Sequence, residues 1–288
     1  MSILIADMSN LAFIKRYGHL PKKAKKVDEY AKELITQEVI KEILNVSSQY
    51  KADKLILAFD SKNPWRKDYY EFYKTNRDVE FDIYKDTVIE SLNDMYEFFS
   101  EFTNAISLRV ERVEADDIIA SSCETFKDEP KVILSRDRDF IQLIDDNTKL
   151  FDPVAKSERV SDNTEFELFL KCIRGDTSDN IPSAYPRVRE TKVKEAFDDP
   201  YKKLNMLEEK RKVDGLRVKE FYELNRKLID LKMIPDEYSQ KIKEAIDAQV
   251  NKNNYNYIKV MKGFAGIGLK NFVANNNNLK LDVLKTPL

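Results

Sequence analysis

Acidic residues follow the short apolar runs of this sequence, at the positions where parallel β-strands would end. Asp7 directly follows Ile3–Ala6, and Asp60 directly follows Leu55–Phe59. In an open α/β sheet, the carboxyl ends of the strands form the ligand-binding edge. Carboxylates gathered at that edge repel one another unless cations lie between them. Five segments show this placement, and their acidic residues are Asp7, Asp60, Glu114, Asp116, Asp117, Asp137, Asp139, Asp176 and Asp179.

Such a constellation is typical of metal-dependent phosphoryl transfer. Mg²⁺ prefers oxygen ligands and retains several waters. Two ions about 3.5–4 Å apart can activate a water and stabilise the leaving oxygen of a phosphodiester. Glu114–Asp117 taken alone is equally compatible with a capping run at a helix N-terminus, where the helix dipole tolerates negative charge. The recurrence of the same placement in five segments favours the metal site.

Strands that alternate with helices must position these residues. Short branched runs predict buried parallel strands, and helical spacing of apolar residues predicts the helices between them. The expected strands are 3–7, 55–60, 106–110, 132–135 and 149–152, and the expected helices are 27–50, 82–102, 114–126 and 139–144. After about residue 160 the signals are helical only, in 164–174, 190–198, 201–211, 215–231, 236–249 and 255–273. The chain is therefore predicted to hold an α/β catalytic domain over 1–160, with a mostly parallel doubly wound sheet, and a helical region over 161–288.

Composition excludes several classes of function. With 288 residues and a net charge of −2, the chain has no global field that would attract nucleic acid, so local patches must decide binding. The single histidine, His19, excludes catalytic triads and His-rich zinc sites, and six glycines are too few for a P-loop or a dinucleotide fingerprint. Cys123 and Cys172 are expected to be buried, reduced thiols. No signal peptide or membrane span is seen, so we expect a cytoplasmic protein.

A segment rich in basic and aromatic residues follows Asp60. Basic residues bind phosphates and aromatic rings stack on unpaired bases, so this mixture suits single-stranded nucleic acid. An amphipathic helix with a buried aromatic face is the alternative interpretation. The residues concerned are Lys62, Trp65, Arg66, Lys67, Tyr69, Tyr70, Phe72, Tyr73, Lys74 and Arg77.

Together these motifs resemble the 5′-nuclease family, which includes flap endonucleases, the 5′-exonuclease domains of bacterial DNA polymerases and phage 5′-nucleases. The resemblance rests on Ile3–Asp7, Phe59–Asp60, Val113–Asp117, Ser135–Leu143 and Gly175–Pro182. Within the family the chain most resembles the ribonuclease H enzymes of T-even phages, which remove RNA primers and flaps. The resemblance implies a PIN-like fold with a helical arch at about 61–85 and a C-terminal region that grips duplex DNA.

The resemblance also implies roles for individual residues. Asp7, Asp60, Glu114 and Asp116 correspond to a first metal site, directly or through water, and Asp117, Asp137, Asp139, Asp176 and Asp179 correspond to a second site and its surroundings. The implied cofactor is a pair of Mg²⁺ ions, with Mn²⁺ as a substitute. Lys74 and Arg77 correspond to catalytic phosphate-clamping residues, and Tyr73 to a base-stacking position. The expected nucleic-acid contacts are Arg66, Lys67, Tyr73, Lys74, Arg77, Arg187, Arg189 and Lys192.

The sequence departs from the family pattern at two places. Arg138 stands between paired aspartates where the family usually carries glycine. It either competes with metal for the carboxylates or points outward toward phosphate, and the outward orientation is favoured. The stretch Ile181–Phe197 lacks the glycine of the family's helix–turn–helix, which leaves a K⁺ site there in doubt. Gly263–Lys270 is interpreted as a helix junction, with a DNA-binding hairpin as the alternative.

The predicted function is a metal-dependent 5′-to-3′ exonuclease or flap endonuclease acting on DNA and RNA–DNA hybrids, which removes RNA primers in phage-type replication. A single-strand binding protein or sliding clamp is the expected partner, and a monomer the expected state. The alternative is a catalytically weak, structure-specific DNA-binding accessory protein. An aspartyl-phosphate phosphatase is disfavoured because the second Asp of its Asp-x-Asp motif is replaced by Ser9. A small RNA-cleaving toxin-type domain would lack both the arch and the helical C-terminal region.

Overall fold

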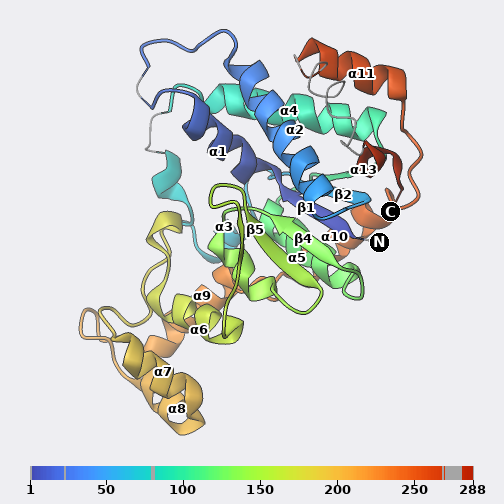
Figure 1. The fold of residues 1–288 in the computed structure, drawn as a ribbon. Coiled ribbons are helices and arrows are strands. Elements are labelled where there is room, and N and C mark those ends of the chain that lie inside the picture. Colours follow the sequence, from blue (N-terminus) through green and yellow to red (C-terminus); the bar gives the residue numbers. More distant parts are fainter. Residues whose placement is uncertain (1, 23, 79–81, 268, 270–280, 288) are drawn as a thin grey trace.

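A six-stranded sheet forms the centre of the molecule (Figure 1). The computed structural model describes residues 2–22, 24–78, 82–267, 269 and 281–287, without the side chains of Arg77 and Asp78. The strand order is β3-β2-β1-β4-β5-β6, and only β6 runs antiparallel. The strands are β1 (Ile3–Asp7), β2 (Lys54–Ala58), β3 (Ile106–Leu108), β4 (Lys131–Leu134), β5 (Thr148–Asp152) and β6 (Ser157–Arg159). The five predicted strands and the doubly wound α/β class are confirmed, whereas β6 was not predicted.

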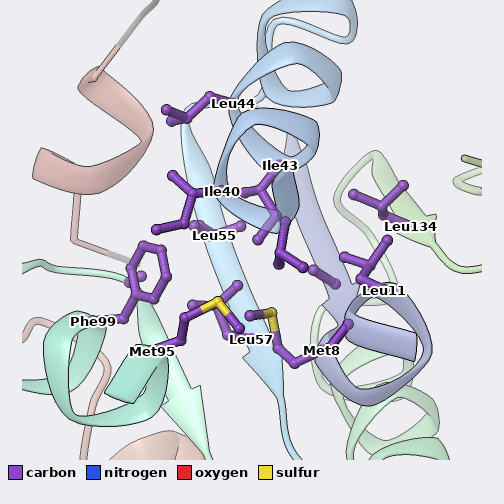
Figure 2. Close-up of a cluster of buried hydrophobic side chains, with 14 of the residues drawn as sticks. Met8, Leu11, Ile40, Ile43, Leu44, Leu55, Leu57, Met95, Phe99 and Leu134 are labelled. Carbon is purple, nitrogen blue, oxygen red and sulfur yellow. The ribbon is translucent and has the colours of Figure 1, made fainter. Parts of the chain in front are cut away.

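Helices cover both faces of the sheet because the central strands are apolar on both sides. Leu4 and Ala6 of β1 face one hydrophobic layer, and Ile3 and Ile5 face the other. The first layer is covered by α1 (Met8–His19), α2 (Ala31–Gln49) and α4 (Lys85–Phe102), and part of it is shown in Figure 2. The second is covered by α5 (Ala115–Thr125) and α10 (Asp236–Asp247). This two-sided burial is what a parallel sheet requires.

Helix α1 was not predicted, and it begins at the first acidic residue. Asp7 is its N-cap and accepts a hydrogen bond from the backbone N–H of Asn10 at 3.0 Å. An aspartate at this position satisfies one of the unpaired N–H groups of the first helical turn. The capping contact also fixes the side chain at the carboxyl edge of the sheet.

The segment predicted as a helical arch contains only two short helices in its described part. These are α3 (Arg66–Tyr69) and the 3₁₀ helix η1 (Thr75–Asp78), while 79–81 lie outside the described residues. Trp65, Arg66 and Tyr73 are buried, but Tyr69 and Phe72 remain about half exposed. The base of the segment therefore packs into the protein, but its described part holds no long amphipathic helix and keeps part of its aromatic surface open.

The later helices do not all lie apart from the sheet. Four of them share a small core of their own: α6 (Thr164–Arg174), α7 (Glu190–Asp198), α8 (Pro200–Glu208) and α9 (Val218–Ile229). The chain then returns through α10 to the second layer, and through α11 (Tyr257–Gly266) and α13 (Asp282–Lys285) to the first. The domain boundary near residue 160 stays a prediction. Residues 257–266 are helical, as the helix-junction interpretation expected, and Gly268 and Lys270 lie outside the described residues.

Among the helices that the structure describes, none is long and apolar enough to cross a lipid bilayer.

Candidate metal and nucleic-acid site

Five of the nine predicted metal ligands line one cleft at the carboxyl edge of the sheet. The cleft has a volume of about 690 Å³ and is also lined by Lys74 and Asn76. These five ligands come from the ends of β1, β2 and β4, from the first turn of α5 and from the 3₁₀ helix η3 (Thr177–Asp179). They are Asp7, Asp60, Asp116, Asp137 and Asp179, and a sixth acidic residue of the lining, Asp82, is paired with Arg16 at 2.8 Å. The fold thus brings together side chains that are up to 172 positions apart, from Asp7 to Asp179.

Two carboxylates of this cleft have raised pKa values, because burial and acidic neighbours outweigh the groups that oppose the shift. Burial, together with the nearby Asp60 and Asp137, raises the pKa of Asp7 to about 7, although hydrogen bonds from Asn10 and Ser135 oppose the shift. Burial, with the charges of Asp137 and Asp7, also raises the pKa of Asp116 well above its ordinary value, although the charge of Lys74 opposes the shift. A bound cation would relieve this repulsion, since it favours the ionised form of each carboxylate.

The donor set fits a divalent ion that prefers oxygen. Over the described ranges, no three acidic, histidine or cysteine side chains converge closely enough to surround a metal by themselves. Mg²⁺ commonly takes one or two carboxylates and completes its octahedron with water. The five carboxylates therefore suit such an ion with a partly aqueous shell.

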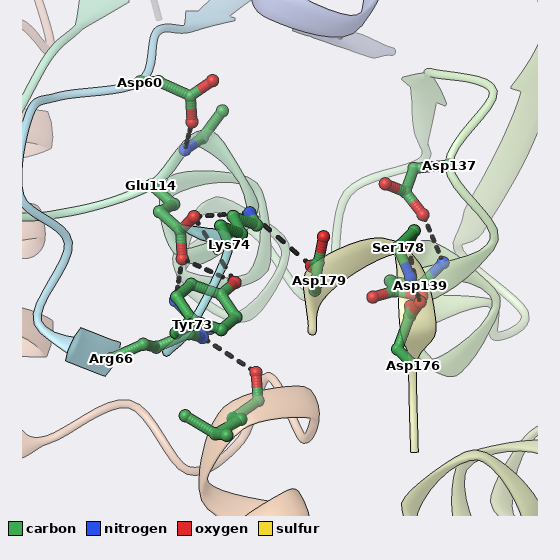
Figure 3. Close-up of polar contacts among 12 residues, drawn as sticks. Asp60, Arg66, Tyr73, Lys74, Glu114, Asp137, Asp139, Asp176, Ser178 and Asp179 are labelled. Carbon is green, nitrogen blue, oxygen red and sulfur yellow. Dashed lines mark hydrogen bonds and ion pairs between the residues drawn. The ribbon is translucent and has the colours of Figure 1, made fainter. Parts of the chain in front are cut away.

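Glu114 lies beside the cleft and is held by three side chains (Figure 3). Lys74 donates to it at 2.5 Å, Arg66 at 2.8 Å and the Tyr73 hydroxyl at 3.1 Å. Burial alone would raise the pKa of Glu114, but Lys74 and Arg66 outweigh burial and lower it to about 2. Glu114 is therefore an ionised carboxylate whose charge the protein already neutralises.

Asp117, predicted to belong to the second metal site or its surroundings, does not line the cleft. Its side chain is completely buried and accepts hydrogen bonds from Arg66 at 2.7 and 2.8 Å and from the Trp65 indole at 2.9 Å. It also completes a capping box at the start of α5 with Glu114. Because these partners occupy its oxygens away from the cleft, Asp117 is a structural anchor in this arrangement.

Two predicted nucleic-acid contacts are also buried. Arg66 is 1% exposed and donates to Glu114, Asp117 and the carbonyl of Leu228, so its guanidinium is not available to a phosphate. Tyr73 is 2% exposed, which leaves no ring face for a base. Both residues instead support Glu114. The prediction failed at these positions because an aromatic-basic segment can pack inward as well as outward.

Asp139 and Asp176 form a second acidic pair outside the cleft lining. Lys171 of α6 bridges them, contacting Asp139 directly and Asp176 at 2.8 Å. Burial raises the pKa of Asp139 to about 6 despite Lys171. Burial alone would raise the pKa of Asp176, but hydrogen bonds from Lys171 and Ser178 outweigh burial and lower the pKa to about 2. Lys171 was missed because nothing local distinguishes it from any other lysine on a helix.

The remaining predicted nucleic-acid residues differ in accessibility. Lys67 is half-buried, and Arg187 and Arg189 are exposed just before α7. Lys192 is paired with Glu209 at 2.7 Å and with the Tyr185 hydroxyl at 2.8 Å. The Arg77 side chain lies outside the described residues. Arg138 is exposed and lines shallow surface pockets rather than the carboxylate cleft, which confirms its outward orientation.

An open, mostly parallel sheet with a carboxylate cleft at its strand ends defines a PIN-like α/β protein of the 5′-nuclease type. Residues 2–169 match the family model described as 5′-3′ exonuclease, N-terminal resolvase-like domain. The chain belongs to this 5′-3′ exonuclease family.

Curated relatives match about half of the chain. A 5′-3′ exonuclease of Mycoplasmopsis pulmonis is 29% identical over 162 residues, covering 51% of this chain and 50% of the relative. A 5′-3′ exonuclease of Buchnera aphidicola is 31% identical over 157 residues, covering 50% of this chain and 52% of the relative. The chain thus spans about half the length of the curated relatives it matches.

Solved structures share the fold over most of the chain. The flap endonuclease of bacteriophage T5, solved with DNA and metal ions, has a TM-score of 0.67 at 20% identity, covering 86% of this chain and 99% of that one. The T5 5′-exonuclease with bound zinc also gives 0.67 at 20% identity, covering 86% of this chain and all of that one. At this level of identity the likeness establishes the fold.

Proposed function

We propose that the protein is a divalent-metal-dependent 5′-nuclease that hydrolyses phosphodiester bonds at 5′ ends or flaps of DNA. The observation that carries the proposal is the cleft in which Asp7, Asp60, Asp116, Asp137 and Asp179 converge beside Lys74. Family membership supports the same reaction, and the T5 neighbour is a flap endonuclease solved with DNA and metal ions. Mg²⁺ is the proposed physiological ion, with Mn²⁺ as a substitute.

The chain's own residues have separable roles in this proposal. Bound divalent ions would supply a water of lowered pKa and neutralise the leaving oxygen. Asp7, Asp60, Asp116, Asp137 and Asp179 hold those ions, while Arg66 and Tyr73 keep Glu114 in place. Lys74 lies in the cleft with its ammonium on Glu114 and reaches Asp179 at 3.8 Å, so it can orient a phosphate placed between these segments. Arg77 is proposed as its partner.

The substrate range, biological role and partners are proposed from the resemblance to phage 5′-nucleases. We infer that RNA–DNA hybrids are cut as well as DNA, and that the enzyme removes RNA primers in phage-type replication. The exposed Arg187 and Arg189 suit backbone contacts to duplex DNA, for which the helical region is the proposed platform. We further propose that the protein is a monomer, that it acts in the cytoplasm, and that its partner is a single-strand binding protein or a sliding clamp.

Cleavage of matched substrates tests the reaction. A labelled 5′-flap DNA and a 5′-RNA-primed duplex are incubated with Mg²⁺, with Mn²⁺ and with chelator. We expect short 5′ products that require metal and disappear in Asp116→Asn and Asp137→Asn. Asp146→Asn is the control, because Asp146 is exposed just before β5, at the opposite end of the sheet. Tight binding without cleavage by the unmodified protein would support the accessory-protein alternative.

A further inference from the structure

The end of helix α9 is hydrogen-bonded to residues next to three acidic segments of the site, although the helix carries none of the predicted metal ligands. The segment 225–231, at the end of α9 and just after it, follows the last of these ligands, Asp179, by 46 positions or more. Its backbone or side chains are joined by hydrogen bonds to residues beside Glu114, beside Asp139 and on both sides of Asp176–Asp179. We call 225–231 the α9 end.

The first contact joins the α9 end to the Glu114 segment. Arg66 donates through Nε to the carbonyl oxygen of Leu228 at 2.9 Å. The same guanidinium donates to Glu114 at 2.8 Å and to Asp117 at 2.7 Å. Since Arg66 is 1% exposed, no water replaces any of these partners without opening the core.

The second contact joins the α9 end to the Asp137–Asp139 segment. The Gln142 amide donates to the carbonyl of Ile229 at 3.1 Å and accepts from the N–H of Leu231 at 2.9 Å. Gln142 also donates to the carbonyl of Asp139 at 2.9 Å. One side chain thereby fixes the 3₁₀ helix η2 (Arg138–Leu143) against the end of α9.

The third contact joins the α9 end to the loop that carries Asp176 and Asp179. Asn225 is completely buried and donates to the carbonyls of Cys172 and Pro182, both at 2.8 Å. These two carbonyls lie on either side of the loop. The contact therefore holds both ends of the loop at a fixed distance from the helix.

From these contacts we propose that the α9 end is a positioning element that sets the spacing of the acidic segments, with Arg66, Gln142 and Asn225 as its positioning residues. The segments carry like charges and come from separate elements, namely strand ends, the start of α5 and the loop after α6, so repulsion drives them apart. Directional hydrogen bonds to backbone groups resist that separation and allow only one relative position of the acidic segments. The inference rests on the proposed function insofar as the spacing serves metal binding.

Gln142 offers a matched test because Gln249 makes the same kind of contact elsewhere. Gln249 accepts from the N–H of Ser107 at 3.0 Å and donates to its carbonyl at 2.9 Å, tying the region after α10 to β3. Both glutamines are half-buried, and β3 carries none of the acidic residues. Gln142→Ala and Gln249→Ala therefore remove comparable hydrogen bonds at different distances from the cleft.

The readouts are Mn²⁺ affinity by calorimetric titration and the melting temperature with chelator and with metal. Both variants should melt somewhat lower in chelator. Only Gln142→Ala should weaken Mn²⁺ binding, by about tenfold or more, which is the usual effect of losing a residue that orients metal ligands. Its metal-induced rise in melting temperature should shrink accordingly. If either alanine variant fails to fold, Gln142→Met and Gln249→Met repeat the comparison with the side-chain volume retained.

The outcomes separate this inference from the proposed function. Equal Mn²⁺ affinity in the two variants, while the unmodified protein binds metal and cleaves, would overturn the positioning role and leave the nuclease intact. An unmodified protein that binds no Mn²⁺ would overturn both. Weakened binding in Gln142→Ala alone supports the α9 end as the element that spaces the site.

Discussion

At the scale of single residues, the site depends on how buried charges are paired. Arg66 faces two buried carboxylates, and its own pKa is raised well above the ordinary value because Asp117 and Glu114 outweigh the effect of burial. The cleft shows the opposite condition, since burial and neighbouring carboxylates raise the pKa of Asp7 and, despite the charge of Lys74, that of Asp116. The ion pairs of Arg66 stabilise the fold, whereas the carboxylates of the cleft repel one another, and a bound metal ion would relieve that repulsion.

Removing Arg66 should destabilise the protein strongly. Arg66→Met keeps much of the side-chain volume but leaves Glu114 and Asp117 buried with fewer partners. We expect the free energy of unfolding to fall by about 3–5 kcal/mol, measured by urea denaturation. Arg112→Met is the control, because Arg112 pairs with Asp68 at the surface and its loss should change little. Equal effects of the two substitutions would contradict a special role for the buried pair.

Asp7 should link stability to pH. Its pKa is raised from 3.8 to about 7 in the folded protein. At pH values between these two, the folded protein still holds the proton of this carboxyl, whereas the unfolded chain has released it. The unfolded chain binds fewer protons there, so stability from this group falls as pH rises, and the loss is complete above about pH 7. In chelator at pH 8, Asp7→Asn should be at least about 1 kcal/mol more stable than the unmodified protein, equivalent to less than one pKa unit.

Urea denaturation at pH 8 and pH 5 measures this difference. The advantage of Asp7→Asn should shrink at pH 5, where the native carboxyl is already protonated. Adding Mg²⁺ at pH 8 should reverse the order, since only the carboxylate gains from the cation. A variant less stable than the unmodified protein in chelator at pH 8 would refute the raised pKa.

At the scale of elements, the junction after α6 positions the last acidic loop. Gly175 ends α6 with φ of 71°, a conformation that side chains rarely adopt. A Cβ there would lie 2.4 Å from the carbonyl oxygen of Pro182. The close approach follows from a short antiparallel bridge between Asp176 and Ile181, which folds the loop back on itself. Glycine is needed at this position for both backbone conformation and space.

Two glycine substitutions separate these requirements. Gly215 has a similar φ of 73°, but a Cβ there would meet nothing within 4 Å. Gly175→Ala should therefore lose at least about 1 kcal/mol more stability than Gly215→Ala, and it should also lower metal-dependent cleavage. Denaturation and flap cleavage of both variants provide the measurement. Similar losses in stability would mean that the loop moves freely away from the added methyl group.

At the scale of the whole molecule, the last part of the chain completes the core of the first part. Tyr238, Ile242 and Ile246 of α10 cover one face of the sheet, and Val260 and Phe264 of α11 join the layer on the other. All five side chains are buried. The α/β layers are therefore assembled from both ends of the sequence (Figure 1).

Truncation after residue 231 should prevent stable folding. Exposing five large side chains costs roughly 8–15 kcal/mol, which is comparable to the whole stability of a typical domain. We expect the truncated chain to elute as aggregates in gel filtration and to lose its cooperative thermal transition. Co-expression of residues 232–288 as a separate polypeptide should restore a soluble complex. A monomeric, cooperatively folding 1–231 chain would contradict this packing.

Local pattern was enough to predict the five parallel strands, the doubly wound sheet and five carboxylates of the cleft, because strand ends and the acidic residues after them are encoded by neighbouring residues. It was not enough to separate Asp116 from Asp117. Successive residues point about 100° apart around a helix, and here only Asp116 faces the cleft while Asp117 turns toward Trp65 and Arg66.

Tertiary structure alone decided which of the remaining charged side chains are paired within the protein and which can meet a ligand. Arg66 meets Leu228 across 162 positions of sequence, and Lys171 meets Asp139 across 32. No periodicity or motif encodes such partners, since they depend on where separate elements pack. The sequence by itself thus determined which chemistry is present at the edge of the sheet. Only the folded arrangement determined which carboxylates remain unbalanced there, because burial and pairing are properties of contacts between distant segments.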